Sequence, residues 1–268
     1  MKYEPEVSTT DSIVVGLDAS SQSMAALKAA TELAALLNVE LEGLFVEDVE
    51  LTKICQYPFQ QEVRSYTGTL RRFDSQTLSR QMRATAASMR RSMEMEAGRR
   101  SVRWRFEVRR GAVTEELLSA SRSAAIVSLG RASRQRISLG STVRAVLDQS
   151  KSPVLILDEQ GTLSMPFVVL FTGDAPSERA LRFATRLVGR QRNSLRVLVH
   201  RVGVNPRLRD LVQQVEDIAA ESDADVDSYP VYDRELNAVA VLERGTLFVP
   251  KSHVDMLHDR RGASVVVP

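Results

Sequence analysis

The stretch that decides the fold covers residues 125–157 and reads AIVSLGRASRQRISLGSTVRAVLDQSKSPVLIL. It begins with an apolar run, Ala125 to Leu129, of the kind that fills a buried strand of a parallel sheet. The run breaks at Gly130 into a basic, hydroxyl-rich loop, and an amphipathic helix and a second apolar run, Pro153 to Leu157, follow the loop. A strand, a loop, a helix and a strand in this order predict a βαβ unit.

Glycines and hydroxyl residues flank this loop in an arrangement typical of phosphate sites. Gly130 ends the strand, and Gly140, Ser141 and Thr142 open the helix. Glycine lets a backbone approach an anion closely, and the unpaired amides at a helix N-terminus favour negative charge. The stretch therefore predicts an anion site at the top of the βαβ unit. The alternative is that these residues only start a helix.

The composition is that of an ordinary globular protein. The 268 residues are 43% hydrophobic and 26% charged, with a formal net charge of +2, which allows one large or two ordinary domains. No apolar run approaches the roughly 20 residues of a membrane span, and the first residues do not resemble a secretion signal, so we expect a cytoplasmic protein without membrane contact. A single cysteine, Cys55, and scattered histidines at 200, 253 and 258 predict neither a disulfide framework nor a metal site.

The pattern that opens the chain returns after a linker-like segment, Gln160 to Pro166. A shift of 154 residues superposes the two copies without a gap over about two elements: Val14 on Val168, Val15 on Val169, Ser23 on Ser177, Ala26-Leu27 on Ala180-Leu181, and Ala30-Thr31 on Ala184-Thr185. We therefore predict two related α/β domains, residues 1–160 and 161–268. Each is expected to be a doubly wound, mainly parallel sheet with helices on both faces.

The second copy is reduced. Its closing segment, Thr246 to Val267, contains two apolar runs with only a short link between them, and Pro250 stands where the first copy has Gly130. Thr172 likewise stands in the place of Asp18. Because both polar markers are missing, we expect any small-molecule site to lie in the first copy.

The middle of the first copy contains a predicted long basic helix from about Asp74 to Ala97. Before it, Glu47 to Leu70 lacks a clear period and is expected to be a loop or a broken helix. After it, Val102 to Val108 alternates like a strand, and Thr114 is expected to cap a short helix that ends at Ser123. The expected inner stripe of the long helix is Leu78, Met82, Thr85, Met89 and Met93, and its mostly outer arginines are Arg80, Arg83, Arg90 and Arg91.

These residues resemble the universal stress protein family, here as a tandem pair. The resemblance rests on residues 125–157 and on IVVGLDASSQSMAALKAATELAALLNVELEGLFVED at residues 13–48. It covers nearly all of the first copy, and mainly the first half and last strand of the second. It implies five-stranded parallel sheets, pairing of the two copies through their final strands, adenine nucleotide binding in one subgroup, and a role in stress tolerance and signalling.

In nucleotide-binding members of the family the loop reads glycine, two residues, glycine, nine residues, glycine, then serine or threonine. Here Ser133 replaces the middle glycine, and the loop is three residues shorter. Arg131, Arg134 and Arg136 offer cationic donors for phosphate in place of backbone amides. By the same resemblance Asp18 lies at the nucleoside end. The candidate nucleotide site is therefore Asp18, Gly130, Arg131, Ser133, Gly140, Ser141 and Thr142.

The sequence contains no convincing nucleophile and base pair, no Gly-x-Ser-x-Gly motif and no Gly-Lys-Ser/Thr motif. We therefore expect a stress-response regulator that is not an enzyme and that binds ATP or another adenine nucleotide in its first domain. It would act on a protein partner that the sequence does not identify, with a homodimer left open. The alternative is a nucleotide-independent module whose basic helix, residues 71–100, docks on an acidic protein or, less favoured, on RNA.

Overall fold

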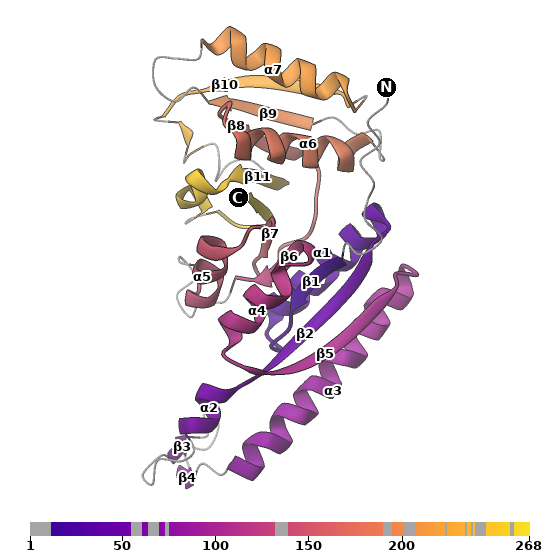
Figure 1. The fold of residues 1–268 in the computed structure, drawn as a ribbon, viewed down its shortest axis with the longest axis vertical. Coiled ribbons are helices and arrows are strands. Elements are labelled where there is room, and N and C mark those ends of the chain that lie inside the picture. The colour runs from indigo at the N-terminus through magenta and orange to yellow at the C-terminus, as the bar shows by residue number, and fades with distance from the viewer. Residues whose placement is uncertain are drawn as a thin grey trace.

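The computed structural model shows an α/β protein built from two halves (Figure 1). The first half runs through β1 (Ser12–Gly16), α1 (Ser21–Leu37), β2 (Glu40–Asp48), α2 (Val49–Ile54), β3 (Gln61–Val63), β4 (Leu70–Arg72), α3 (Ser75–Arg99), β5 (Trp104–Gly111), α4 (Val113–Ser121), β6 (Ala124–Gly130), α5 (Ser141–Gln149) and β7 (Val154–Leu157). The second half runs through β8 (Phe167–Phe171), α6 (Ala175–Gly189), β9 (Leu195–His200), α7 (Leu208–Ala220), β10 (Val226–Val231), β11 (Thr246–Pro250), the 3-10 helix η1 (Lys251–Leu257) and β12 (Ser264–Val267). The structure describes residues 12–54, 61–63, 70–72, 75–131, 139–189, 195–200, 207–222, 224–233, 235–236, 238, 245–257 and 260–268.

Both halves contribute to one continuous sheet. In the described part of the chain this sheet has ten strands, in the order β10-β9-β8-β11-β12-β7-β6-β1-β2-β5. Neighbouring strands run parallel, except that β12 and β7 pair antiparallel where the two halves meet. Each half therefore presents the same order of five strands, and the predicted tandem, mainly parallel α/β fold is confirmed.

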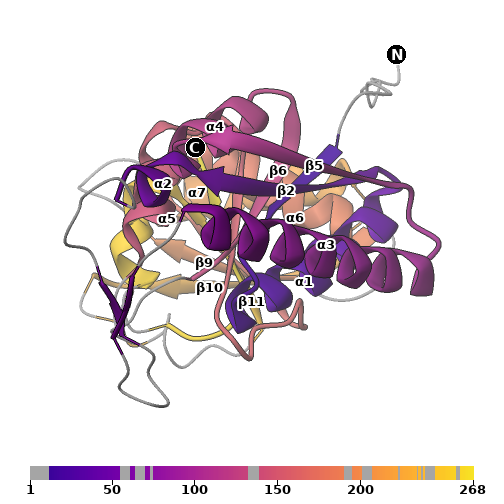
Figure 2. The same cartoon turned by 90° about the horizontal axis from the view of Figure 1, so that it is seen from below.

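Helices cover both faces of the sheet, which explains why the strands in its middle, such as β1 and β8, are apolar without alternation. Ile13 and Val15 pack in the core beneath α1, α3, α6 and α7, whereas Val14 packs in the opposite core beneath α4, α5 and η1. Successive strand residues point to opposite faces, so a sheet covered on both sides needs apolar residues at every position. Figure 2 shows α3 running alongside β2 and β5.

A serine hydroxyl caps the first helix. Ser20 is the N-cap of α1, and its Oγ accepts a hydrogen bond from the Ser23 amide at 3.0 Å. The helix ends at Asn38, which adopts the left-handed conformation with φ 58°. The long basic helix is also confirmed as α3, with Met89 and Met93 buried in the core.

The start of α4 and the segment from Glu47 to Leu70 differ in detail from what the sequence predicts. Thr114 does not cap α4: the helix begins one residue earlier, and its N-cap is Ala112, which has no side-chain hydrogen bond to the helix. Two acidic residues in the first turn, Glu115 and Glu116, favour the helix N-terminus instead. The segment from Glu47 to Leu70 contains the short helix α2 and the outer strand β3, which pairs antiparallel with β4, and residues 55–60 and 64–69 lie outside the described residues.

The reduced end of the second half is confirmed as well. Two strands, β11 and β12, are joined through η1, where the first half has the longer connection through α5. Among the described residues, no helix combines the length and the apolar character needed to cross a bilayer.

Candidate functional site

A cavity of about 410 Å³ opens at the carboxyl ends of β1 and β6. The chain leaves these neighbouring strands toward opposite sides of the sheet, and such a switch point leaves a crevice in doubly wound folds. Three of the predicted site residues, Asp18, Gly130 and Thr142, line this cavity. Its other walls are mainly apolar and are Gly16, Leu17, Ser23, Leu44, Phe45, Val46, Asp48, Leu51, Leu78, Gln81, Met82, Thr85, Val113, Leu117, Leu129 and Val143.

Gly130 is a glycine because α1 approaches it closely. A Cβ at this position would lie 2.6 Å from the carbonyl carbon of Gln22 and 2.7 Å from the amide nitrogen of Ser23. These are backbone atoms in the first turn of α1, so they cannot move aside as a side chain could. The packing of the helix on the sheet therefore accounts for the residue type, independently of any ligand.

Asp18 forms a tight turn that leads into α1. Its Oδ1 accepts hydrogen bonds from the Ser20 amide at 2.9 Å and from the Ser20 hydroxyl at 2.6 Å. Ala19 between them adopts a left-handed conformation with φ 65°. Within the described structure, Oδ2 of Asp18 makes no hydrogen bond, and the residue is exposed on the cavity wall. One carboxylate oxygen is thus engaged in the turn, and the other is left for a further hydrogen bond.

The predicted loop residues do not all lie at the cavity. Thr142 lines the cavity, Gly140 is the N-cap of α5, and Ser141 is exposed in the first turn of that helix. Arg131 turns toward the second half, where its guanidinium donates hydrogen bonds to the backbone oxygens of Leu257 and Arg260. Ser133, together with Arg134 and Arg136, lies outside the described residues.

Sequence reasoning missed the part of the cavity wall that α3 contributes. Leu78, Gln81, Met82 and Thr85 of α3 line the cavity, although three of them were assigned to an inner core stripe. The apolar stripe of α3 could have indicated this wall. Its Met89 and Met93 are buried in the core, whereas its residues nearer the start of α3 line the cavity. Asp48 at the end of β2 was also missed, and its position at a strand end next to β1 could have indicated it.

The corresponding place in the second half holds a cluster of two histidines and two aspartates. The Nε2 of His200 lies 2.6 Å from Oδ1 of Asp233, and the rings of His200 and His253 meet edge to face at 5.7 Å between centroids. Burial lowers the pKa of His253, the nearby His200 lowers it further, and the Asp174 carboxylate opposes both. Burial raises the pKa of Asp174, but hydrogen bonds from the Ser177 amide and the Thr172 hydroxyl outweigh it, so the pKa is lowered overall.

Among the described residues, no three His, Cys, Asp or Glu side chains are placed so that they could hold a metal ion together, and this cluster is no exception. His258 and its neighbour lie outside them.

A ten-stranded sheet of this order, with a cavity at its switch point, defines a tandem member of the doubly wound α/β class. The sequence model of the universal stress protein family matches residues 9–158, which is more than half of the chain. The protein therefore belongs to the universal stress protein family, and the predicted membership is confirmed. A search of curated protein sequences gave no significant match.

Solved structures extend the likeness of the fold to the whole chain. A universal stress protein from Archaeoglobus fulgidus is 16% identical, with 96% of this chain and 98% of that chain covered and a TM-score of 0.73. A protein of Pseudomonas aeruginosa assigned to the same family is 11% identical, with coverage of 96% and 93% and a TM-score of 0.58. A universal stress protein in complex with cAMP is 21% identical and covers 56% of this chain and 98% of its own, with a TM-score of 0.41.

Proposed function

We propose that the protein is a stress-response regulator that binds an adenine nucleotide in the cavity of its first half and acts by binding rather than by turnover. The observation that carries the proposal is the convergence of Asp18, Gly130 and Thr142 on one cavity of about 410 Å³ with mainly apolar walls. That size lies within the range of about 300–1,000 Å³ common for small-molecule sites.

Each side of the cavity suits one part of a nucleotide. The apolar residues of β2 and α3 would cover the base, and Oδ2 of Asp18 would accept a hydrogen bond from a ribose hydroxyl. At the other side, the Gly130 backbone and the Thr142 hydroxyl near the start of α5 would receive the phosphates. A member of the family is known in complex with cAMP, so cyclic and linear adenine nucleotides are both candidates.

Signalling would pass through Arg131, which follows the phosphate side of the cavity directly. Its guanidinium holds two backbone oxygens of the second half, at Leu257 and Arg260. An anion bound beside Gly130 would attract this guanidinium and compete with those oxygens. Nucleotide occupancy would thereby alter the contact between the halves and the surface that a protein partner recognises.

The test is calorimetric titration and thermal unfolding of the full chain with ATP, ADP, AMP and cAMP. A nucleotide at one hundred times its dissociation constant stabilises the folded state by about 2.7 kcal/mol, which is readily measured. Asp18→Asn and Thr142→Val should each weaken binding at least about tenfold, and Arg90→Gln on the exposed face of α3 should not. Absence of binding at millimolar nucleotide, or undiminished binding in both variants, would overturn the proposal.

A second candidate function rests on α3 alone. Arg80, Arg83, Arg90 and Arg91 are all exposed on this helix, and Arg80 and Arg83 flank a shallow hollow with Gln76 and Ser79. Such a surface would dock on an acidic protein or, second in preference, RNA. Partner binding that weakens with salt and is insensitive to nucleotide and to Asp18→Asn would favour it. Binding that is unchanged when Arg80 and Arg83 are replaced by glutamine would exclude it.

A further inference from the structure

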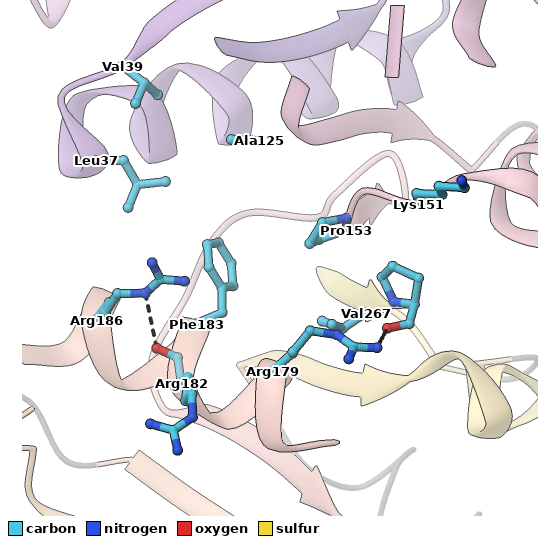
Figure 3. Close-up of a pocket in the computed structure, with 11 residues that line it drawn as sticks. Leu37, Val39, Ala125, Lys151, Pro153, Arg179, Arg182, Phe183, Arg186 and Val267 are labelled. Atoms are coloured by element: carbon cyan, nitrogen blue, oxygen red, sulfur yellow. Dashed lines mark hydrogen bonds between the residues drawn. The ribbon is translucent and has the colours of Figure 1, made fainter. Parts of the chain in front are cut away.

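A second cavity, of about 450 Å³, lies at the seam between the two halves (Figure 3). The first half contributes the end of α1 and the beginnings of β2, β6 and β7, at Leu37, Val39, Ala125 and Pro153. Asp18 and Gly130 stand at the other, carboxyl ends of the first-half strands. The seam cavity is therefore separate from the candidate nucleotide site.

The cavity follows from the way the halves join. On one face of the sheet, α1 packs on β6, β1 and β7, and α6 packs on β8, β11 and β12. Between the end of α1 and α6, the antiparallel strands β7 and β12 meet. Phe183 projects from α6 toward the first half across this gap (Figure 3). The apolar residues that line the cavity are Leu37, Val39, Ala125, Pro153, Phe183, Val267 and Pro268.

The polar side chains that line this cavity are all cationic in the described structure: Lys151, Arg179, Arg182 and Arg186. Arg182 pairs with Glu221, which lies outside the lining, and Arg179 donates a hydrogen bond to the backbone oxygen of Pro268. Arg186 donates through Nε to the carbonyl oxygen of Arg182 at 3.3 Å, and its guanidinium carbon lies 5.9 Å from the centre of the Phe183 ring. An apolar cavity with this rim attracts negative charge.

The basic rim is not required by the repeated fold. With the shift of 154 residues between the copies, Arg179, Arg182 and Arg186 of α6 correspond to Ala25, Lys28 and Glu32 of α1. Phe183 corresponds to Ala29 in the same comparison. The first half folds with small and mixed-charge residues at these places. The arginines and the phenylalanine are therefore specific to α6.

We infer that the seam cavity binds a small amphipathic anion, whose apolar chain lies along Val39, Ala125 and Phe183 and whose carboxylate or phosphate group meets Arg186. The volume of about 450 Å³ is that of a small-molecule site and is too small for a folded partner. Cationic stems that pack along apolar surface while their heads stay in solvent are suited to such a ligand. Because the ligand contacts both halves, it also strengthens their association.

Calorimetric titration of the full chain with decanoate, kept below its micelle concentration, tests the inference. Decanoate is expected to bind saturably, and 1-decanol, which has the same chain without the charge, at least about tenfold more weakly. Decyl phosphate in a parallel titration decides whether a carboxylate or a phosphate is the preferred head group. The Asp18→Asn variant should bind decanoate as the wild type does. Loss of decanoate binding can therefore be told apart from loss of nucleotide binding.

Two variants separate the charge from the apolar chain. Arg186→Gln should weaken decanoate at least about tenfold, with Arg90→Gln on α3 as the matched arginine control. Ala125→Met fills the cavity wall and should weaken decanoate and decyl phosphate alike, after circular dichroism has confirmed the fold. The inference is overturned if decanoate does not saturate, if decanol binds as well, or if neither Arg186→Gln nor Ala125→Met changes the affinity.

Discussion

The two halves build the same turn before their first helix, but the carboxylate and the hydroxyl have changed places. In the first half, Asp18 at the strand end accepts hydrogen bonds from Ser20, and Ser20 caps α1. In the second half, Thr172 at the strand end donates to Asp174, and Asp174 accepts from the Ser177 amide at 2.9 Å. The middle residue is left-handed in both turns, with φ 65° at position 19 and φ 77° at position 173.

This exchange decides where a negative charge is available. The Asp174 carboxylate is held at the start of α6, where the helix amides and the Thr172 hydroxyl stabilise it. The Asp18 carboxylate lies on the wall of the cavity. Its Oδ2 makes no hydrogen bond in the described structure. A strand end without its acidic residue can therefore retain the turn while losing the group that would meet a ligand.

A second difference lies inside the sheet, one pairing position along from the cavity. Ser128 pairs with Val15, and Phe248 pairs with Val169, so the two residues occupy equivalent places. Ser128 donates a hydrogen bond to the Ala26 carbonyl oxygen at 3.1 Å and is fully buried. Phe248 instead packs edge to face on Phe167 and Phe183, at 5.5 and 6.0 Å between centroids. Small residues let α1 approach the first sheet closely, whereas aromatic rings fill the second.

Removal of the buried aromatic ring of Phe248 is expected to have the largest effect on stability. Phe248→Ala should lower the free energy of unfolding by about 3–5 kcal/mol, because the ring is fully buried and its loss leaves a cavity. The equivalent change in the first half, Ser128→Ala, removes one hydroxyl and should cost only about 0.5–1.5 kcal/mol. Urea unfolding monitored by circular dichroism measures both. Equal costs at the two positions would contradict the difference in packing described above.

A glycine substitution tests the close approach of α1. Gly130→Ala should lower the free energy of unfolding by about 1–3 kcal/mol, because its Cβ would lie within 2.7 Å of backbone atoms of α1. Gly98→Ala in α3 is the matched control, since a Cβ there meets nothing within 4 Å, and it should stabilise by about 0.5–1 kcal/mol. Thermal unfolding of the two variants provides the measurement. A Gly130→Ala protein as stable as the wild type would show that α1 does not need this approach.

Placing the residues of the second turn in the first tests whether the position of the carboxylate decides nucleotide binding. The double change Asp18→Thr with Ser20→Asp should leave the free energy of unfolding within about 1 kcal/mol, because serine and aspartate cap helices equally well. Nucleotide affinity should fall at least about tenfold, since the carboxylate then serves the helix. Calorimetry alongside thermal unfolding separates the two results. Unchanged affinity with unchanged stability would remove Asp18 from the proposed site.

The tandem fold could be predicted from the sequence because the repeat supplied the first strand and the first helix of each half twice. The ends of neighbouring parallel strands meet at one edge, which led to the expectation that Asp18 and Gly130 lie together, and both line one cavity with Thr142. The direction of Arg131 was not predictable, because its guanidinium is fixed by backbone oxygens from the other half. The seam cavity was equally hidden, because its walls come from both copies and arise only when β7 and β12 pair.

The last and smallest effect concerns the histidine pair that only the second half possesses. The pKa of His253 is lowered in the folded protein, so between the folded and unfolded pKa values the unfolded chain binds more protons. His253 therefore favours folding fully above its unfolded pKa of about 6.5, and this contribution is lost as the pH falls below that value. The lowered pKa of Asp174 acts below about pH 4 and leaves this window undisturbed. Urea unfolding between pH 5 and 8 should show a slope that His253→Gln reduces, and a slope that persists unchanged would assign the acid sensitivity to other groups.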